Sequence, residues 1–325
     1  MGRWISHLRV EVCLLALLAM GAILPASAIA QAPAYITQWG TFGAGNGQFH
    51  DPFFIVTDTE GNVYVSDTGN NRIQKFTSGG DYLTQWGSFG SGSGQFMGPE
   101  GVATDAAGNV YVADHNNQRI QKFSSTGTYL TEWDDPSGRG LFYPTALAIG
   151  ATGMIFVSTP FDEFPGIFRL SSTGILLNVW YTPGFYGVPE ALVTDAAGSL
   201  YASGGGNIVK FTSDGAPLIL CGSFGSGDGQ FFGVSGIAID ADNNVYASDV
   251  SNNRIQEFTS DGNYLTQWGS LGSGDGQFVN PRGIAIDPAG NIYVVDSVNQ
   301  RVEKFGSLPT PTKATSWARL KRLYR

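Results

Sequence analysis

Six residues share one repeated position in the chain, and three of them carry a charge that could do chemistry. Five of the six follow a proline, and the set in chain order is Phe53, Glu100, Thr145, Glu190, Ser235 and Arg282. Carboxylate oxygens are good ligands for hard cations. Glu100 and Glu190 could therefore hold a Ca²⁺ ion or a cationic ligand, with Arg282 as the counter-charge. The alternative is a solvated rim that binds nothing.

A second group combines aromatic rings with carboxylates between residues 134 and 186. Its members are Asp134, Asp135, Tyr143, Phe161, Asp162, Glu163, Phe164, Tyr181, Phe185 and Tyr186. Aromatic side chains next to carboxylates suit a peptide, a sugar or a cationic partner. The alternative is that these rings only pack irregular loops against one another.

Catalysis has little other support in the sequence. Beyond the first 30 residues the only histidines are His50 and His115, so a three-histidine zinc centre cannot be built. There is no Gly-x-Ser-x-Gly segment, and Cys221 has no evident histidine partner. We therefore predict no catalytic residue and no cofactor, with a Ca²⁺ ion on Glu100 and Glu190 as the alternative.

Glycine-rich stretches recur four times, at residues 40–49, 87–96, 222–231 and 269–278. A phosphate-binding loop needs a Gly-Lys-Ser/Thr ending or a helix that follows it, and none of the four has either. Each stretch ends in a phenylalanine. We interpret the stretches as wide connections between structural units, anchored by that ring.

The elements that must position all these residues form a repeat. Segments similar to Tyr-Leu-Thr-Gln-Trp-Gly begin at Tyr35, Tyr82, Tyr129, Leu176, Pro217 and Tyr264, in steps of 47, 47, 47, 41 and 47 residues. Each copy has four short strand-like runs bounded by turn residues. This pattern predicts an all-β fold, a six-bladed β-propeller of four-stranded antiparallel blades. The N-terminal strand precedes the first complete blade and should close the last one, which removes an exposed edge.

The copies also resemble the NHL repeat, through the pattern Pro-x-Gly-Ile-Ala-x-Asp-x-x-Gly-Asn-x-Tyr-Val-x-Asp-x-x-Asn-x-Arg-Ile-x-Lys-Phe. The resemblance covers about residues 35–305 and is strongest in blades one, two, five and six. It implies a six-bladed propeller of a family whose members serve as binding platforms, extracellular sensors and, in some branches, RNA-binding or enzymatic domains. Related lactonase propellers use carboxylates and calcium, which would implicate Glu100 and Glu190. Amidating-lyase propellers use a three-histidine zinc centre, which this chain lacks.

Connections alternate between two faces in an up-and-down blade. The glycine-rich stretches should therefore share a face, which we name the top face, with the loops between second and third strands. The first strands should line an axial channel, and the repeated position should lie where that channel opens. The second group should gather on the top face over blades three and four. An Asp and an Arg flank four of the loops, as Asp67 and Arg72 do, and we expect each such pair to bond locally.

The two ends of the chain differ from the repeats. Residues 1–30 combine two arginines with an apolar run over 12–25 and small-residue cleavage sites after Ala28 or Ala30. This combination predicts a signal peptide and a secreted or extracytoplasmic protein. Residues 33–308 form the predicted propeller domain. Residues 309–325 are a Pro/Thr linker and a short basic amphipathic tail that could contact the cell envelope or an anionic surface. A frayed terminus is the alternative for the tail.

The net charge of the predicted propeller limits which molecules it could bind. Residues 33–308 hold 26 acidic and 11 basic residues, a net charge of −15, whereas residues 309–325 carry +5. A body of that charge repels phosphate backbones, which argues against nucleic acid. We predict an exported, monomeric, non-enzymatic platform that binds a protein, peptide or glycan on its top face. The alternatives are a metal-dependent hydrolase or lyase, with Ca²⁺ or Zn²⁺ at the axial channel, and a structural component of the cell envelope.

Overall fold

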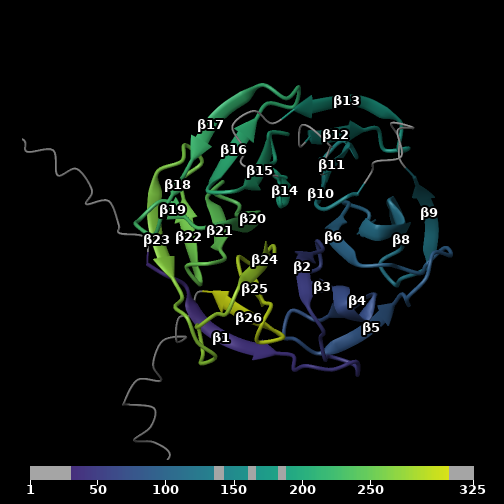
Figure 1. Cartoon of the computed structure of the whole chain (residues 1–325), viewed down its shortest axis with the longest axis horizontal. Helices are drawn as coiled ribbons and strands as arrows, with labels where there is room; N and C mark the ends of the chain where they lie inside the picture. Colours follow the sequence, from purple (N-terminus) through teal and green to yellow (C-terminus); the bar gives the residue numbers. More distant parts are fainter. Residues whose placement is uncertain (1–30, 135–142, 160–165, 182–187, 307–325) are drawn as a thin grey trace, which may run out of the picture. The chain divides into compact units, whose positions relative to one another are not determined.

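Six four-stranded antiparallel sheets are arranged as blades around a ring (Figure 1). The computed structural model describes residues 31–134, 143–159, 166–181 and 188–306. Regular structure in this part of the chain is almost entirely β-strand, with two short 3₁₀ turns, η1 (Thr68–Asn70) and η2 (His115–Asn117). The all-β, six-bladed prediction is confirmed. None of the helices in these ranges is long or apolar enough to cross a bilayer.

Blades one to five take their strands in chain order from the axis outwards, and blade six does so for its first three strands (Figure 1). Blades one to three contain β2 (Pro52–Thr57), β3 (Val63–Asp67), β4 (Arg72–Phe76), β5 (Tyr82–Trp86); β6 (Pro99–Thr104), β7 (Val110–Asp114), β8 (Arg119–Phe123), β9 (Tyr129–Trp133); and β10 (Leu147–Ile149), β11 (Ile155–Thr159), β12 (Gly166–Leu170), β13 (Leu176–Tyr181). Blades four to six contain β14 (Ala191–Thr194), β15 (Leu200–Gly204), β16 (Asn207–Phe211), β17 (Pro217–Cys221); β20 (Val234–Ile239), β21 (Val245–Asp249), β22 (Arg254–Phe258), β23 (Tyr264–Trp268); and β24 (Pro281–Ile286), β25 (Ile292–Asp296), β26 (Arg301–Gly306). A short parallel pair, β18 (Ser223–Phe224) and β19 (Gln230–Phe231), lies in the third glycine-rich stretch.

The N-terminal strand closes the ring. β1 (Ala34–Trp39) pairs antiparallel with β26, from Tyr35 opposite Phe305 to Trp39 opposite Val302. Blade six therefore takes its outermost strand from the other end of the chain, as the order of the repeats predicts. Because this pairing joins the first blade to the last, unfolding either end disturbs both.

The glycine-rich stretches are joints between blades. The phenylalanine that ends each one is fully buried in blades one, two, five and six, as Phe49, Phe96, Phe231 and Phe278. In the first stretch a Cβ on Gly40 (φ +109°) would lie 2.6 Å from the Phe49 ring, so only glycine allows this approach. The structural interpretation of these stretches is confirmed.

A buried polar cluster locks each joint to its blade. In blade one the Asp67 carboxylate accepts hydrogen bonds from the His50 backbone N–H at 2.7 Å and from Arg72 Nε at 2.6 Å. Arg72 in turn donates to the backbone carbonyls of Gly45 and Gln48 in the glycine-rich stretch, both at 2.8 Å. The same Asp–Arg pair recurs as Asp114–Arg119, Asp249–Arg254 and Asp296–Arg301. The local pairing expected from the sequence is confirmed.

Cys221 fills a position that a tryptophan holds in the outermost strands of the other blades. Trp39 packs on Gly80 of the next blade, and Cys221 packs in the same way on Gly262, where a Cβ would lie 2.8 Å from Sγ. The thiol is buried and unbonded within the described ranges. It is a small apolar filler of the core.

Cys221 is expected to resist thiol reagents while the protein is folded. Burial raises the pKa of its thiol to about 11, and only the thiolate is nucleophilic. With Ellman's reagent at pH 8, protein made without residues 1–30 should react slowly. The same sample should release one equivalent of thionitrobenzoate in 8 M urea. Rapid reaction of the folded protein would contradict the buried placement.

Candidate functional site

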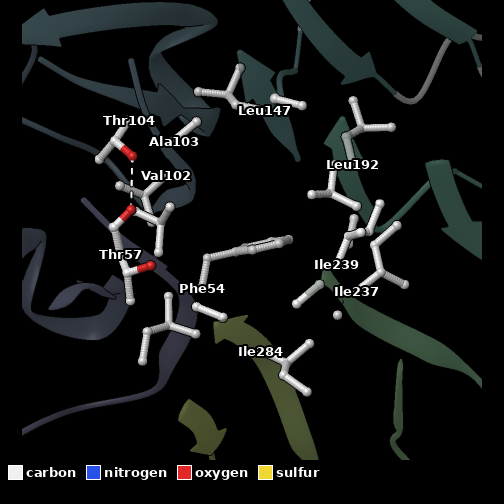
Figure 2. A pocket seen from close by; sticks show the side chains of 18 of the residues that line it. Phe54, Thr57, Val102, Ala103, Thr104, Leu147, Leu192, Ile237, Ile239 and Ile284 are labelled. Atoms are coloured by element: carbon white, nitrogen blue, oxygen red, sulfur yellow. Dashed lines mark hydrogen bonds between the residues drawn. The ribbon is translucent and has the colours of Figure 1, made fainter. Parts of the chain in front are cut away.

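The first strands of all six blades line an axial channel. It contains a cavity of about 250 Å³, lined by β2, β6, β10, β14, β20 and β24. Figure 2 shows that its labelled side chains are mainly apolar, with Phe54, Leu192 and Ile237 among them. The Thr104 hydroxyl turns aside and donates to the Thr57 backbone carbonyl at 3.0 Å. The body of the channel therefore offers shape and apolar contact and no acid or base.

The repeated position lies where these strands begin, at the end of the channel that we name the mouth. Four of its residues are the second residue of a first strand. Glu190 immediately precedes β14, and Thr145 lies two residues before β10. The three charged members, Glu100, Glu190 and Arg282, come from blades two, four and six. They therefore alternate around the ring with Phe53, Thr145 and Ser235.

The charged members are close enough to perturb one another. Burial raises the pKa of Glu100 to about 7, with Arg282 opposing the rise and Glu190 adding to it. Burial also raises the pKa of Glu190, against the lowering effects of the Ser235 hydroxyl and Arg282. Arg282 thus acts on both carboxyl groups from a third blade. The structure brings together the three residues that the sequence placed at one repeated position.

His115 joins the mouth from the top face. It belongs to η2, and its Nδ1 lies 3.6 Å from Glu100 Oε2 and 3.3 Å from the Pro144 carbonyl oxygen. Burial lowers the pKa of His115, so the imidazole is mainly neutral at pH 7. This contact was not predicted from the sequence, although a histidine stands where the corresponding loops have Thr68, Val250 and Ser297.

Two of the mouth charges have no ion-pair partner within the ranges that the structure describes. The Arg282 guanidinium carbon lies 4.3 Å from the centre of the Phe53 ring, a cation–π contact. In those same ranges no cationic group lies within ion-pair distance of Glu190. Ser235 is 1% exposed, and its hydroxyl faces Glu190 without forming a well-aligned hydrogen bond to any described residue. A partly buried charge without a partner lowers the stability of the fold unless a ligand pairs with it.

A divalent cation fits this set of donors poorly. Two carboxylates converge there, but the fixed positive charge of Arg282 acts on both of them. Among the described residues no group of three or more His, Cys, Asp or Glu side chains is arranged to hold a metal. The Ca²⁺ alternative for Glu100 and Glu190 stays a prediction, and Arg282 argues against it.

The second predicted group lies mostly outside the described residues. Asp135, Phe161, Asp162, Glu163, Phe164, Phe185 and Tyr186 fall in the gaps, as does the side chain of Tyr181 at the end of β13. Asp134 is exposed after β9. The Tyr143 ring centre lies 5.4 Å from that of His115, so Tyr143 borders the mouth. The expected binding sector over blades three and four stays a prediction.

An apolar groove opens where blade four has its shortest top loop. Two residues, Gly205 and Gly206, join β15 to β16, whereas four residues separate Asp67 from Arg72 in blade one. The groove has a volume of about 780 Å³ and is lined by Leu220, Phe224 and Phe232, among others. The two phenylalanine rings stack edge to face at 4.7 Å. The step of 41 residues between the repeats indicates a shortened unit, but the groove was not predicted from the sequence.

A closed ring of six four-stranded blades around an axial channel with a polar mouth defines a six-bladed β-propeller. The family model described as NHL repeat matches three stretches of this chain, residues 49–76, 96–123 and 278–305. Each match runs from the buried phenylalanine of a joint to the end of a third strand, in blades one, two and six. The resemblance inferred from the sequence is confirmed.

Solved structures share the fold at low sequence identity. Virginiamycin B lyase from Staphylococcus aureus is 15% identical, covering 83% of this chain and 95% of its own, with a TM-score of 0.58. A gluconolactonase from Xanthomonas campestris is 16% identical, covering 84% and 96%, with a TM-score of 0.60. A structure from Bacteroides thetaiotaomicron is 16% identical, covering 83% and 76%, with a TM-score of 0.64. No curated protein sequence matches the chain. These likenesses concern the fold alone.

Proposed function

We propose that the protein is an exported binding protein whose ligand enters the mouth of the axial channel from the top face. One observation carries the proposal: Glu190 and Arg282 both lie at the mouth, and neither has an ion-pair partner among the described residues. A folded chain gains nothing from holding such charges apart in a partly desolvated place. A ligand that pairs with them would recover that free energy.

The wider prediction from the sequence is compatible with this site. The mouth opens on the face where the glycine-rich joints lie, so the end of a protein, a peptide or a glycan could reach it. The apolar run near the N-terminus supports export. The acidic body favours ligands that are neutral or cationic.

An enzymatic role is the second candidate, and it rests on Glu100. Its carboxyl group has a pKa of about 7 and lies beside His115. A carboxylic acid that exchanges its proton near neutral pH is suited to general acid–base catalysis. The structural neighbours include a lyase and a gluconolactonase, so a hydrolase or lyase on this fold is chemically reasonable.

A thermal-shift experiment on the mature protein tests the proposal. The panel contains amino acids, short peptides, glycan fragments and sugar lactones. A ligand at 100 times its Kd adds about 2.7 kcal/mol of stability, and hence raises Tm by about 5 °C for a domain of this size. We expect at least one class to raise Tm, and Glu190→Gln and Arg282→Gln to abolish most of that rise.

Asp51→Asn is the matched control for the thermal shift. Asp51 lies two residues beyond the first joint, and its side chain is 71% exposed. This variant should keep the full ligand-induced rise. The proposal fails if the two mouth variants respond to every binding ligand as strongly as the control. Turnover of a panel member that Glu100→Gln abolishes would instead favour the enzymatic role.

A further inference from the structure

The charges at the mouth define one ligand chemistry. We infer that the mouth takes a zwitterion of the α-amino acid type, with the ligand's carboxylate on Arg282 and its ammonium group on Glu190. The inference rests on the proposed function, because it names the ligand of the same site. The Arg282 guanidinium and the Glu190 carboxylate come from different blades and do not pair with each other. Each can therefore bind the opposite charge of a single small molecule.

The carboxylate end of the ligand has a preorganised partner. The Arg282 guanidinium carbon lies 4.3 Å from the centre of the Phe53 ring, and this contact restricts the group. None of the described residues accepts a hydrogen bond from its N–H groups, so they can donate to a ligand. The Ser248 hydroxyl donates to the Arg282 backbone carbonyl at 2.5 Å and fixes the main chain below it. A planar fork held in this way recognises a carboxylate through two parallel hydrogen bonds.

The ammonium end has an acceptor of matching charge. The Glu190 backbone N–H donates to the Ser203 carbonyl at 2.7 Å, which ties the residue to β15. Its carboxylate lies at the mouth with the buried Ser235 hydroxyl beside it. An ammonium group has three donors. Glu190 and Ser235 together offer oxygen acceptors for it.

Other simple ligands match the mouth less well. A plain anion that bound Arg282 would also approach the carboxyl groups of Glu100 and Glu190. A metal ion that bound the two glutamates would lie near Arg282, which acts on both. A zwitterion places each of its charges beside the opposite one.

The channel beneath the mouth indicates the kind of side chain. Its lining is mainly apolar, and the cavity measures about 250 Å³. Phe54 and Leu192 are among the residues that Figure 2 places around it. An aliphatic side chain that pointed down the channel would lose contact with water and gain contact with these residues. Leucine is therefore a suitable probe.

Calorimetric titration with three matched compounds tests the inference. Leucine carries both charges, leucinamide lacks the carboxylate, and N-acetylleucine lacks the ammonium group. A charge-assisted hydrogen bond changes affinity by about 10- to 100-fold. We expect the mature protein to bind leucine at least about 10-fold more tightly than either blocked compound.

Each variant should lose the preference for leucine over one blocked compound and keep the preference over the other. Arg282→Gln should bind leucine and leucinamide equally but still disfavour N-acetylleucine. Glu190→Gln should bind leucine and N-acetylleucine equally but still disfavour leucinamide. Arg282→Lys keeps the positive charge and should retain part of the preference over leucinamide, and Asp51→Asn should behave as the wild type.

The outcomes separate the inference from the proposed function. Equal binding of the three compounds, or binding of none of them, overturns the inference. If another panel member then raises Tm in a way that depends on Glu190 and Arg282, the proposed function survives without it. If no ligand depends on these two residues, both fail.

Discussion

Asp249→Ala is expected to lower the free energy of unfolding by about 3–5 kcal/mol. Asp249 is fully buried, and its carboxylate accepts hydrogen bonds from the Phe232 backbone N–H, Asn252, Arg254 and Gln256. Removing it leaves the buried Arg254 guanidinium without its counter-charge. The remaining donors lose an acceptor in a place that water does not reach.

Urea denaturation of the purified variant, followed by tryptophan fluorescence, measures this loss. Asp242→Ala is the matched control, because Asp242 is an exposed residue of the turn between the first and second strands of the same blade. We expect the control to change stability by less than about 0.5 kcal/mol. A loss of similar size in both variants would mean that the polar cluster does not hold the joint.

Glu303→Gln is expected to stabilise the protein at pH 8 by about 3 kcal/mol. Glu303 stands where blades one, two and five have Gln74, Gln121 and Gln256. The amide of Gln121 donates to the Gln95 carbonyl at 2.7 Å and to Asp114 at 3.0 Å. An ionised carboxylate has no such donor. The substitution restores the bonds of the sister blades and removes a buried negative charge near Asp296. It also removes the ion pair between Glu303 and Arg301, but Arg301 keeps Asp296 as its counter-charge.

The gain should depend on pH in a defined direction. Burial raises the pKa of Glu303 from 4.5 to about 7, with Arg301 and the Gly276 N–H opposing the rise and Asp296 adding to it. The folded protein therefore holds this proton more tightly than the unfolded chain. Its stabilising contribution is complete below pH 4.5 and is lost as the pH rises through about 7.

Urea titrations of the wild type and Glu303→Gln from pH 5 to pH 8 test this sign. The difference between them should be small at pH 5 and largest at pH 8, and other titrating groups cancel because both proteins share them. Gln121→Glu should create the opposite effect in blade two, a loss of stability that grows with pH. A constant difference across the range would show that Glu303 is ionised throughout.

The architecture could be read from the sequence because each unit of the propeller is local. A strand of about five residues, a turn with Gly or Asn at a positive φ and a second strand need only near neighbours. Asn243 illustrates this: it replaces a glycine of the sister turns and adopts a φ of +65°. The closing strand was predictable as well, since a chain that starts with a fourth strand and ends with a third has one way to remove both edges.

The positions at which the repeats differ from one another were harder to interpret from the sequence. A comparison of the copies revealed Glu303 as a departure from glutamine, but the burial that perturbs its pKa comes from the packing of the joint around it. The short loop of blade four was likewise visible in the repeat length. The groove lined by Leu220, Phe224 and Phe232 also includes Gly205 and Gly206 of that loop, so it depends on how the loop packs beside the neighbouring joint.

The sequence by itself determined the number of blades, the closure of the ring and the position at which each blade meets the axis. Those features follow from short-range turn chemistry and from strand alternation repeated six times. Only the tertiary structure decided that Glu100, Glu190 and Arg282 act on one another, that His115 contacts Glu100, and that Arg282 stacks on Phe53. These residues belong to different blades or loops, so their distances, burial and pKa values depend on how the ring closes.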